Sequence, residues 1–214
     1  MSTKYVESEG RKGGLSAREL KIVRSEEFRN DLKEALAVLR DGGIILYPTD
    51  TVWGLGCDAT NADAVRKIYE IKKRADSKAL ITLVDSEAKV EFYVEKVPSV
   101  AWDVMELNSR PTTIVFDGGR NLATNLLAED GSVGIRVTGE LFSRELCFRF
   151  KKAIVSTSAN LSGEPSPACF EQISPEIIEA VDYVVKYRQK DRSKVQPSTV
   201  IKLGAHGEVK VIRP

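Results

Sequence analysis

The chain has 214 residues, and 32 Lys and Arg against 31 Asp and Glu leave a formal net charge of +1. At roughly 150 residues per domain, this length accommodates one large domain or two small ones. A hydrophobic content of 42% and a charged content of 29% exclude a disordered or collagen-like chain. The balanced charge also argues against a protein whose whole surface binds nucleic acid.

The first twenty residues are polar and lack the apolar stretch of a signal peptide. We expect residues 1–20 to form a flexible N-terminal segment and residues 21–214 to form a single domain. No run approaches ~20 consecutive apolar residues, so we expect no transmembrane helix and no contact with a membrane. The three cysteines lie far apart without a CxxC pair, which suits a reducing compartment. The sequence therefore favours a cytoplasmic protein.

In chain order, the first expected element is a short strand over residues 20–24. A helix then begins at Ser25, whose side chain can cap it, and apolar residues recur at helical spacing until a glycine pair ends it. The apolar run 43–47, closed by a proline, predicts a buried strand. Apolar residues show no regular spacing over residues 49–61, whereas their spacing over residues 62–72 predicts a second helix.

Strands and helices alternate in the rest of the chain. Strands are expected over residues 79–84, 112–116, 132–137, 153–157, 183–186, 197–203 and 208–213. Helical segments are expected over residues 86–94, 98–108, 141–151 and 169–180. Helices interleaved with short apolar strands imply one layered α/β domain, a sheet with helices packed on it.

Two loops follow buried strands, which is where open α/β sheets bind ligands. The loop after Tyr47 carries Thr49, Asp50 and Thr51 ahead of two glycines that let backbone approach a ligand closely. The loop over residues 158–163 is built from Ser, Asn and Gly, whose small donors suit phosphate or carboxylate oxygens. Composition alone also allows ordinary turns, in which Asp and Asn bond their own backbone.

A third candidate is the basic run Lys72-Lys73-Arg74 at the end of the second predicted helix. If the chain becomes extended there, Lys72 and Arg74 share one side. A Lys point charge beside a planar Arg fork can hold a polyphosphate. The plainer alternative is that these residues complement the helix dipole and are solvated.

Taken together, the motifs resemble those of the YrdC/Sua5 family. The resemblance covers about residues 26–213, and each motif is weak alone, but five stand in order. They are Tyr47-Pro-Thr-Asp-Thr-Val-Trp-Gly-Leu-Gly56, Ile71-Lys-Lys-Arg74, Ser132-Val-Gly-Ile-Arg-Val137, Ser156-Thr-Ser-Ala-Asn-Leu-Ser-Gly163 and Pro197-Ser-Thr-Val200.

The resemblance implies a YrdC-like fold, a twisted mixed sheet flanked by helices with a concave basic surface, over residues 21–214. It also implies a threonylcarbamoyl-AMP synthase, a nucleotidyltransferase that joins L-threonine, bicarbonate and ATP and releases pyrophosphate. The product feeds the t6A modification at position 37 of tRNA, so the implied partners are downstream t6A-transfer proteins and tRNA or double-stranded RNA.

The family's functional residues fall on matching positions here. The resemblance implies that Lys72 and Arg74 are catalytic. It assigns ATP to Lys72, Arg74, Arg136, Ser158, Asn160 and Ser198, and threonine to Thr49, Thr51 and Thr199. The needs of the reaction agree with these assignments, because a carbamate and ATP are both anions that need charge neutralisation and positioning. No carboxylate cluster is evident, so no metal ligand is assigned, and Mg²⁺ is expected through the ATP phosphates.

The chain departs from the family pattern at three places. Trp53 replaces the usual Tyr, Ala75 replaces a proline after the Lys-x-Arg pair, and Ser109-Arg110-Pro111 replaces a Pro-Gly-Pro. Two other functions stay open. One is an RNA-binding or ribosome-associated module, suggested by basic residues in 66–78 and 186–194. The other is a carbamoyl-adenylate enzyme like the YrdC-like domain of hydrogenase-maturation carbamoyltransferases, which the chain length and cysteine content disfavour.

Overall fold

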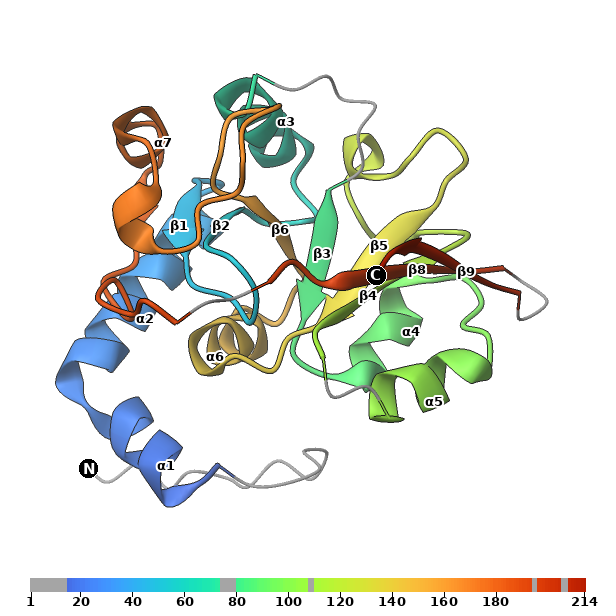
Figure 1. The fold of residues 1–214 in the computed structure, drawn as a ribbon, viewed down its shortest axis with the longest axis horizontal. Coiled ribbons are helices and arrows are strands. Elements are labelled where there is room, and N and C mark those ends of the chain that lie inside the picture. The colour runs from blue at the N-terminus through green and yellow to red at the C-terminus, as the bar shows by residue number, and fades with distance from the viewer. Residues whose placement is uncertain (1–14, 74–79, 108–109, 194–195, 205–207) are drawn as a thin grey trace.

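The computed structural model describes residues 15–73, 80–107, 110–193, 196–204 and 208–214. Within them, nine strands form one mixed sheet in the order β7-β1-β2-β6-β3-β5-β4-β8-β9 (Figure 1). The strands are β1 Ile45–Tyr47, β2 Gly54–Gly56, β3 Ile81–Val84, β4 Thr112–Phe116, β5 Val133–Val137, β6 Ile154–Ser158, β7 Tyr183–Val184, β8 Thr199–Leu203 and β9 Val209–Arg213. The expected α/β architecture, a twisted mixed sheet flanked by helices, is confirmed.

The helices in the same part of the chain match the predicted order closely. They are α1 Ala17–Arg24, α2 Glu26–Arg40, α3 Ala62–Ile71, α4 Val90–Tyr93, α5 Val100–Leu107, α6 Leu141–Phe150 and α7 Pro175–Glu179, with short 3-10 turns at Glu87–Lys89, Thr124–Leu126 and Phe170–Gln172. The Ser25 side chain accepts a hydrogen bond from the Phe28 amide and caps α2, as predicted.

The strand expected over residues 20–24 is wrong, because this segment belongs to α1. Ser16 accepts the amide of Glu19, and the Glu19 carboxylate accepts the Ser16 amide, which together form a capping box. Residues 15–20 thus lead directly into the fold, while residues 1–14 of the expected flexible segment lie outside the described part. The prediction also missed β2, which lies inside the aperiodic stretch 49–61.

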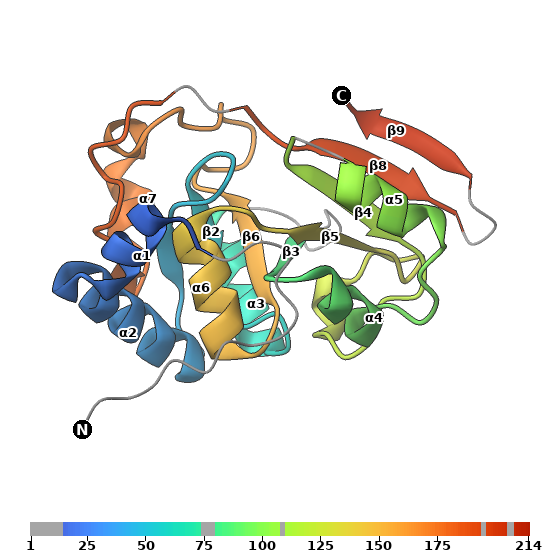
Figure 2. The same ribbon diagram turned by 90° about the horizontal axis from the view of Figure 1, so that it is seen from below.

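Apolar side chains cover both faces of the sheet. One core gathers α2, α6 and β1, and the other gathers α3, α4, α5 and β4. Figure 2 shows α2 and α6 side by side on the first face. Because side chains alternate along a strand, Ile154 of β6 enters the first core and Val155 the second.

The three residues of β2 lie between β1 and β6 and leave little room for side chains. A Cβ at Gly56 would lie 2.6 Å from Cε1 of Tyr47 and 3.0 Å from the carbonyl oxygen of Val155. Only hydrogen fits there without movement of the Tyr47 ring. Glycine at this position is therefore a packing requirement of the β1–β2 pair.

We predict that Gly56→Ala lowers the free energy of unfolding by roughly 1–3 kcal/mol, the usual cost of overpacking. Gly139→Ala is the matched control, since a Cβ there meets no described atom within 4 Å. It should change stability by less than about 0.5 kcal/mol. Urea unfolding of both variants measures the difference, and equal effects would contradict the packing account.

Candidate functional site

Side chains alternate between the two faces along β6, and this alternation places a polar patch at the end of the buried strand. On β6, Ile154, Ser156 and Ser158 share one face, and Ile154 belongs to the core beside α6. Ser156 and Ser158 continue this face beyond the core. They line a pocket of about 200 Å³, so the same strand supplies both core and pocket.

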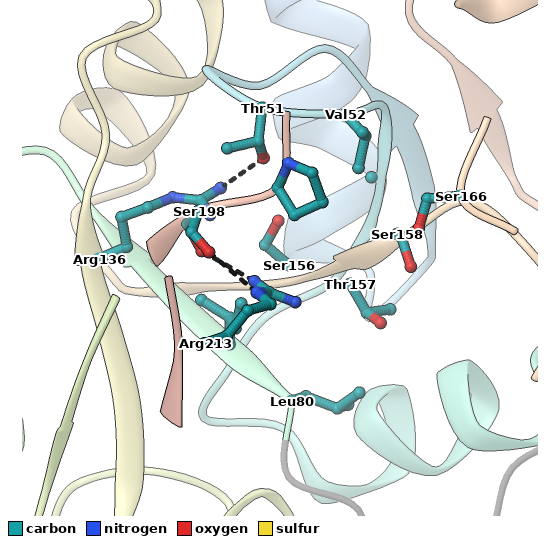
Figure 3. A pocket seen from close by; sticks show the side chains of 13 residues that line it. Thr51, Val52, Leu80, Arg136, Ser156, Thr157, Ser158, Ser166, Ser198 and Arg213 are labelled. Carbon is teal, nitrogen blue, oxygen red and sulfur yellow. Dashed lines mark hydrogen bonds between the residues drawn. The ribbon is translucent and has the colours of Figure 1, made fainter. Parts of the chain in front are cut away.

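The pocket draws its wall from segments far apart in the sequence (Figure 3). Its lining residues are Thr51, Val52, Gly54, Leu80, Ile81, Arg136, Ser156, Thr157, Ser158, Ser166, Pro197, Ser198 and Arg213. Four of the site residues predicted from the sequence meet here, namely Thr51, Arg136, Ser158 and Ser198. The hydroxyl groups and two guanidinium groups make the wall a set of hydrogen-bond donors for anionic oxygens.

Arg136 of β5 is the buried cation of the pocket, with a side chain that is 3% exposed. Its Nη2 lies 3.1 Å from Oδ1 of Asp50 and donates to Oγ1 of Thr51 at 3.3 Å. Its Nε is buried and has no hydrogen-bond partner among the described residues. The guanidinium group therefore keeps donor capacity for a ligand.

Arg213 reaches the pocket through a β-bulge in the pairing of β8 with β9. Val200 is paired with Arg213, but the next pair is Ile201 with Val211, so Ile212 is an extra residue. Paired residues share a face, which places Arg213 on the side of Val200 rather than on the core side of Ile201. The bulge thus turns Arg213 toward the pocket.

The Arg213 side chain contacts a predicted site residue. Its Nε donates to the carbonyl oxygen of Ser198 at 3.0 Å, and its Nη2 donates to Ser198 Oγ at 3.2 Å (Figure 3). The Ser198 hydroxyl also lies 2.9 Å from Thr113 Oγ1. Burial lowers the pKa of Arg213 from its ordinary value, and the positive charge of Arg136 lowers it further. Two like charges converge on the pocket, which favours an anion between them.

Lys72 lies beside this pocket but does not line it. It is 2% exposed, and its Nζ donates to the carbonyl oxygens of Ser158 and Asn160 at 2.6 and 2.7 Å. The Ser162 amide in turn donates to the Lys72 carbonyl at 2.9 Å. The ammonium group therefore positions the loop that follows β6. Its expected contact with ATP remains a prediction.

The other predicted site residues have different places. Thr49 is buried, and its Oγ1 donates to the Val52 carbonyl at 2.8 Å and accepts the Thr51 amide at 3.0 Å. The Asn160 amide group donates to two carbonyls of its own loop. Thr199 is half-buried in β8, paired with Thr112. Arg74 lies outside the described residues, as does Ala75.

Sequence reasoning missed Arg213, because its direction depends on a bulge rather than on a local motif. Asp50 was noted as an acid in the loop but not as the partner of Arg136. Trp53, whose role was open, is 7% exposed and packs against Phe170 at 5.0 Å between ring centroids. It also lines a small pocket with Thr49, Thr51 and Arg188, so it has both a packing contact and a place on a pocket wall.

The basic residues that suggested RNA binding are largely engaged where the structure describes them. Arg66 pairs with Asp63, Lys73 with Glu176, and Arg192 with Glu171. Lys67 donates to the Gly42 carbonyl, and Arg188 is held by Asp191. Acidic side chains thus offset four of these five cations locally.

The described residues also bear on whether the chain has a metal site or a membrane-spanning helix. No group of three or more His, Cys, Asp and Glu side chains within the described ranges is arranged to hold a metal ion. Over the same ranges, none of the helices combines the length and apolar character needed to span a membrane.

Residues 37–214 match the model of the Sua5/YciO/YrdC family, described as "Telomere recombination". A match over this much of the sequence shows that the chain belongs to this family. It is 33% identical over 175 residues to the threonylcarbamoyl-AMP synthase of Pseudoalteromonas translucida, covering 80% of this chain and 92% of the relative. It is 33% identical over 192 residues to the putative threonylcarbamoyl-AMP synthase of Methanocaldococcus jannaschii, covering 89% of each.

Solved structures with the same fold include Sua5 of P. abyssi. A variant of that protein gives a TM-score of 0.79 at 25% identity, covering 90% of this chain and 58% of that chain. The crystal structure of P. abyssi Sua5 complexed with L-threonine gives a TM-score of 0.74 at 25% identity, covering 84% of this chain and 52% of that one. The chain thus spans little more than half of Sua5.

We predict that Lys72→Met lowers the free energy of unfolding by about 2 kcal/mol or more, because it leaves two half-buried carbonyl oxygens without a charged donor. Faster amide exchange in residues 158–162 should accompany the loss. The control is Lys73→Met, which removes an ion pair whose side chains are 64% and 54% exposed. That variant should lose less than about 1 kcal/mol. Similar losses in both variants would show that the Lys72 ammonium does not hold the loop.

Proposed function

We propose that the protein is a threonylcarbamoyl-AMP synthase. It combines L-threonine, bicarbonate and ATP into threonylcarbamoyl-adenylate, with release of pyrophosphate and water. The family relationship and relatives of that name support the proposal, as does the L-threonine complex of a structural neighbour. The enzyme class is a nucleotidyltransferase, because the reaction transfers an adenylyl group to a carbamate.

The pair of arginines in the pocket is the structural observation that supports this proposal most directly. Arg136 and Arg213 converge on one pocket whose remaining wall is rich in hydroxyl groups. A carbamate and a triphosphate repel each other in water, and the reaction needs both in one place. Fixed cations in a partly closed pocket lower that repulsion and stabilise the charge that develops at phosphorus.

The chemistry requires two steps in sequence. The amine of L-threonine attacks CO₂ or bicarbonate to form a carbamate, and a carbamate oxygen then attacks the α-phosphorus of ATP. The bond from the α-phosphorus to the bridging oxygen breaks, and pyrophosphate leaves. No covalent enzyme nucleophile is needed, which agrees with a pocket of donors and cations. Burial raises the pKa of the Cys57 and Cys147 thiols, so neither is a ready nucleophile.

We assign the residues by the charge and hydrogen bonds that they offer. Arg136, Arg213, Ser158 and Ser198 receive phosphate or carboxylate oxygens. Thr49 and Thr51, with Thr199, belong to the threonine side of the site. Lys72 acts with Asn160 through the loop after β6, and Arg74 completes the phosphate contacts. Tests of single residues distinguish these roles.

We expect Mg²⁺ to bind together with ATP rather than at a separate protein site. The residues described around the pocket offer cations and hydroxyls rather than a set of carboxylates, and Asp50 already faces Arg136. They do not fit a resident metal ion, and no step runs through a protein-bound metal. We propose that ATP binds as its Mg²⁺ complex, with the ion held by the phosphates.

The chemistry of the product indicates what kind of reaction must follow. A threonylcarbamoyl-adenylate is a short-lived mixed anhydride, so an acceptor reaction must consume it promptly. We propose that downstream t6A-transfer proteins use it to modify position 37 of tRNA. Direct contact with tRNA or double-stranded RNA is not required for the chemistry at this pocket.

We predict pyrophosphate release that depends on L-threonine, bicarbonate and ATP-Mg together. Arg213→Met should lower kcat/KM for ATP about tenfold or more, since it removes one charged contact with the phosphates. Arg213 lies on the edge strand β9 and is exposed as a residue, with only its guanidinium group partly desolvated against Ser198, so the melting temperature should change little. Arg192→Met, which removes only an exposed pair with Glu171, is the control and should keep full activity. Release without added threonine, or none at all, would contradict the proposed function.

A further inference from the structure

Arg188 is a half-buried cation that the family motifs do not include. Its side chain is 25% exposed, and its backbone has φ +65°, a conformation that favours glycine. Such strain at a bulky residue persists only where its surroundings hold it. The positive φ of Arg188 allows its guanidinium group to reach the contacts described next.

The guanidinium group joins three segments. Its Nη1 donates to the carbonyl oxygen of Thr49 at 3.2 Å and lies 3.5 Å from Oε1 of Glu140. Its Nε and Nη2 donate to Oδ2 of Asp191 at 2.9 and 2.8 Å. Arg188 therefore connects the loop after β1, the start of α6 and the chain after β7.

Both carboxylates are held in place for this contact. Glu140 is 6% exposed and caps α6 by accepting the Ser143 amide at 2.8 Å. Burial raises the pKa of Glu140, and the charge of Arg188 opposes that rise. Hydrogen bonds from Ser193, and then Arg188, lower the pKa of Asp191 to about 2. Asp191 is thus a carboxylate at neutral pH and keeps the guanidinium group oriented.

The backbone that carries Arg188 is anchored to α2. The carboxylate of Asp31, 3% exposed, accepts the Lys186 amide at 2.9 Å and the Tyr187 amide at 2.7 Å. The Tyr187 ring also packs against the rings of Phe28 and Phe142. Arg188 therefore projects from a fixed support toward Thr49.

We propose that Arg188 is a positioning residue for the loop 49–52, and so for threonine binding. Arg136 holds this loop at Thr51 and Asp50, and Arg188 holds its backbone at Thr49. The two contacts fix the hydroxyl pair of Thr49 and Thr51, which lie 3.1 Å apart. The part concerning threonine rests on the proposed function, whereas the order of the loop does not.

The test uses Arg188→Gly in the full chain. Glycine accepts the positive φ without strain, so this change removes the side chain and leaves the backbone conformation favoured. KM for L-threonine should rise about tenfold, with kcat and KM for ATP changed less than about threefold. Added guanidinium ion at low millimolar concentration should restore part of the threonine affinity, which a general loss of stability would not allow.

Arg192→Met is the matched control, because Arg192 lies in the same segment and pairs only at the surface with Glu171. It should leave all three kinetic constants unchanged. An unchanged KM for threonine in Arg188→Gly, or an equal rise in KM for ATP, would overturn the assignment.

Amide exchange separates this inference from the proposed function. Exchange at residues 49–52 should quicken in Arg188→Gly and stay unchanged in Arg192→Met, whether or not the protein is active. If the parent protein shows no threonine-dependent pyrophosphate release, the proposed function fails while the exchange result still decides the positioning of the loop. Unchanged exchange in Arg188→Gly overturns the inference.

Discussion

A buried guanidinium group is the constraint on which the pocket depends. Arg136 is 3% exposed, and a charge at such a place is costly unless a counter-charge accompanies it. Asp50 supplies that charge from the loop after β1, although β2, β6 and β3 separate β1 from β5 in the sheet. The pair therefore fixes a loop across the sheet. Because Nε of Arg136 has no partner among the described residues, the group that orders the pocket can also receive an anion.

Cations in this molecule serve two distinct purposes. Lys72 and Arg188 donate to backbone carbonyls and order the loops after β6 and β1. Arg136 and Arg213 line the pocket itself. The net charge of +1 hides this division, since acidic residues such as Asp63, Glu176 and Glu171 pair with exposed cations instead. A near-neutral chain thus concentrates positive charge where two anionic substrates have to meet.

Local signals determined how much of this could be predicted. The cap and apolar period of α2 lie within the helix itself, so its prediction is confirmed. The segment 20–24 has strand-forming residues, but the capping box at Ser16 and Glu19 outweighs them, and that signal was readable in the sequence. β2 has two glycines among three residues and no side-chain pattern to detect. Arg213 depends on a one-residue bulge, which only the pairing of β8 with β9 reveals.

The bulge in β9 also has a consequence for the order of folding. The pocket takes Thr51 from the loop between β1 and β2 and Arg213 from β9. Contacts between such distant parts of a chain form slowly, because a long loop has to close first. During synthesis, a nascent chain can pair α2 with α6 before β9 has been made. A competent pocket therefore forms only after β9 has joined the sheet, and ligand capture reports that pairing.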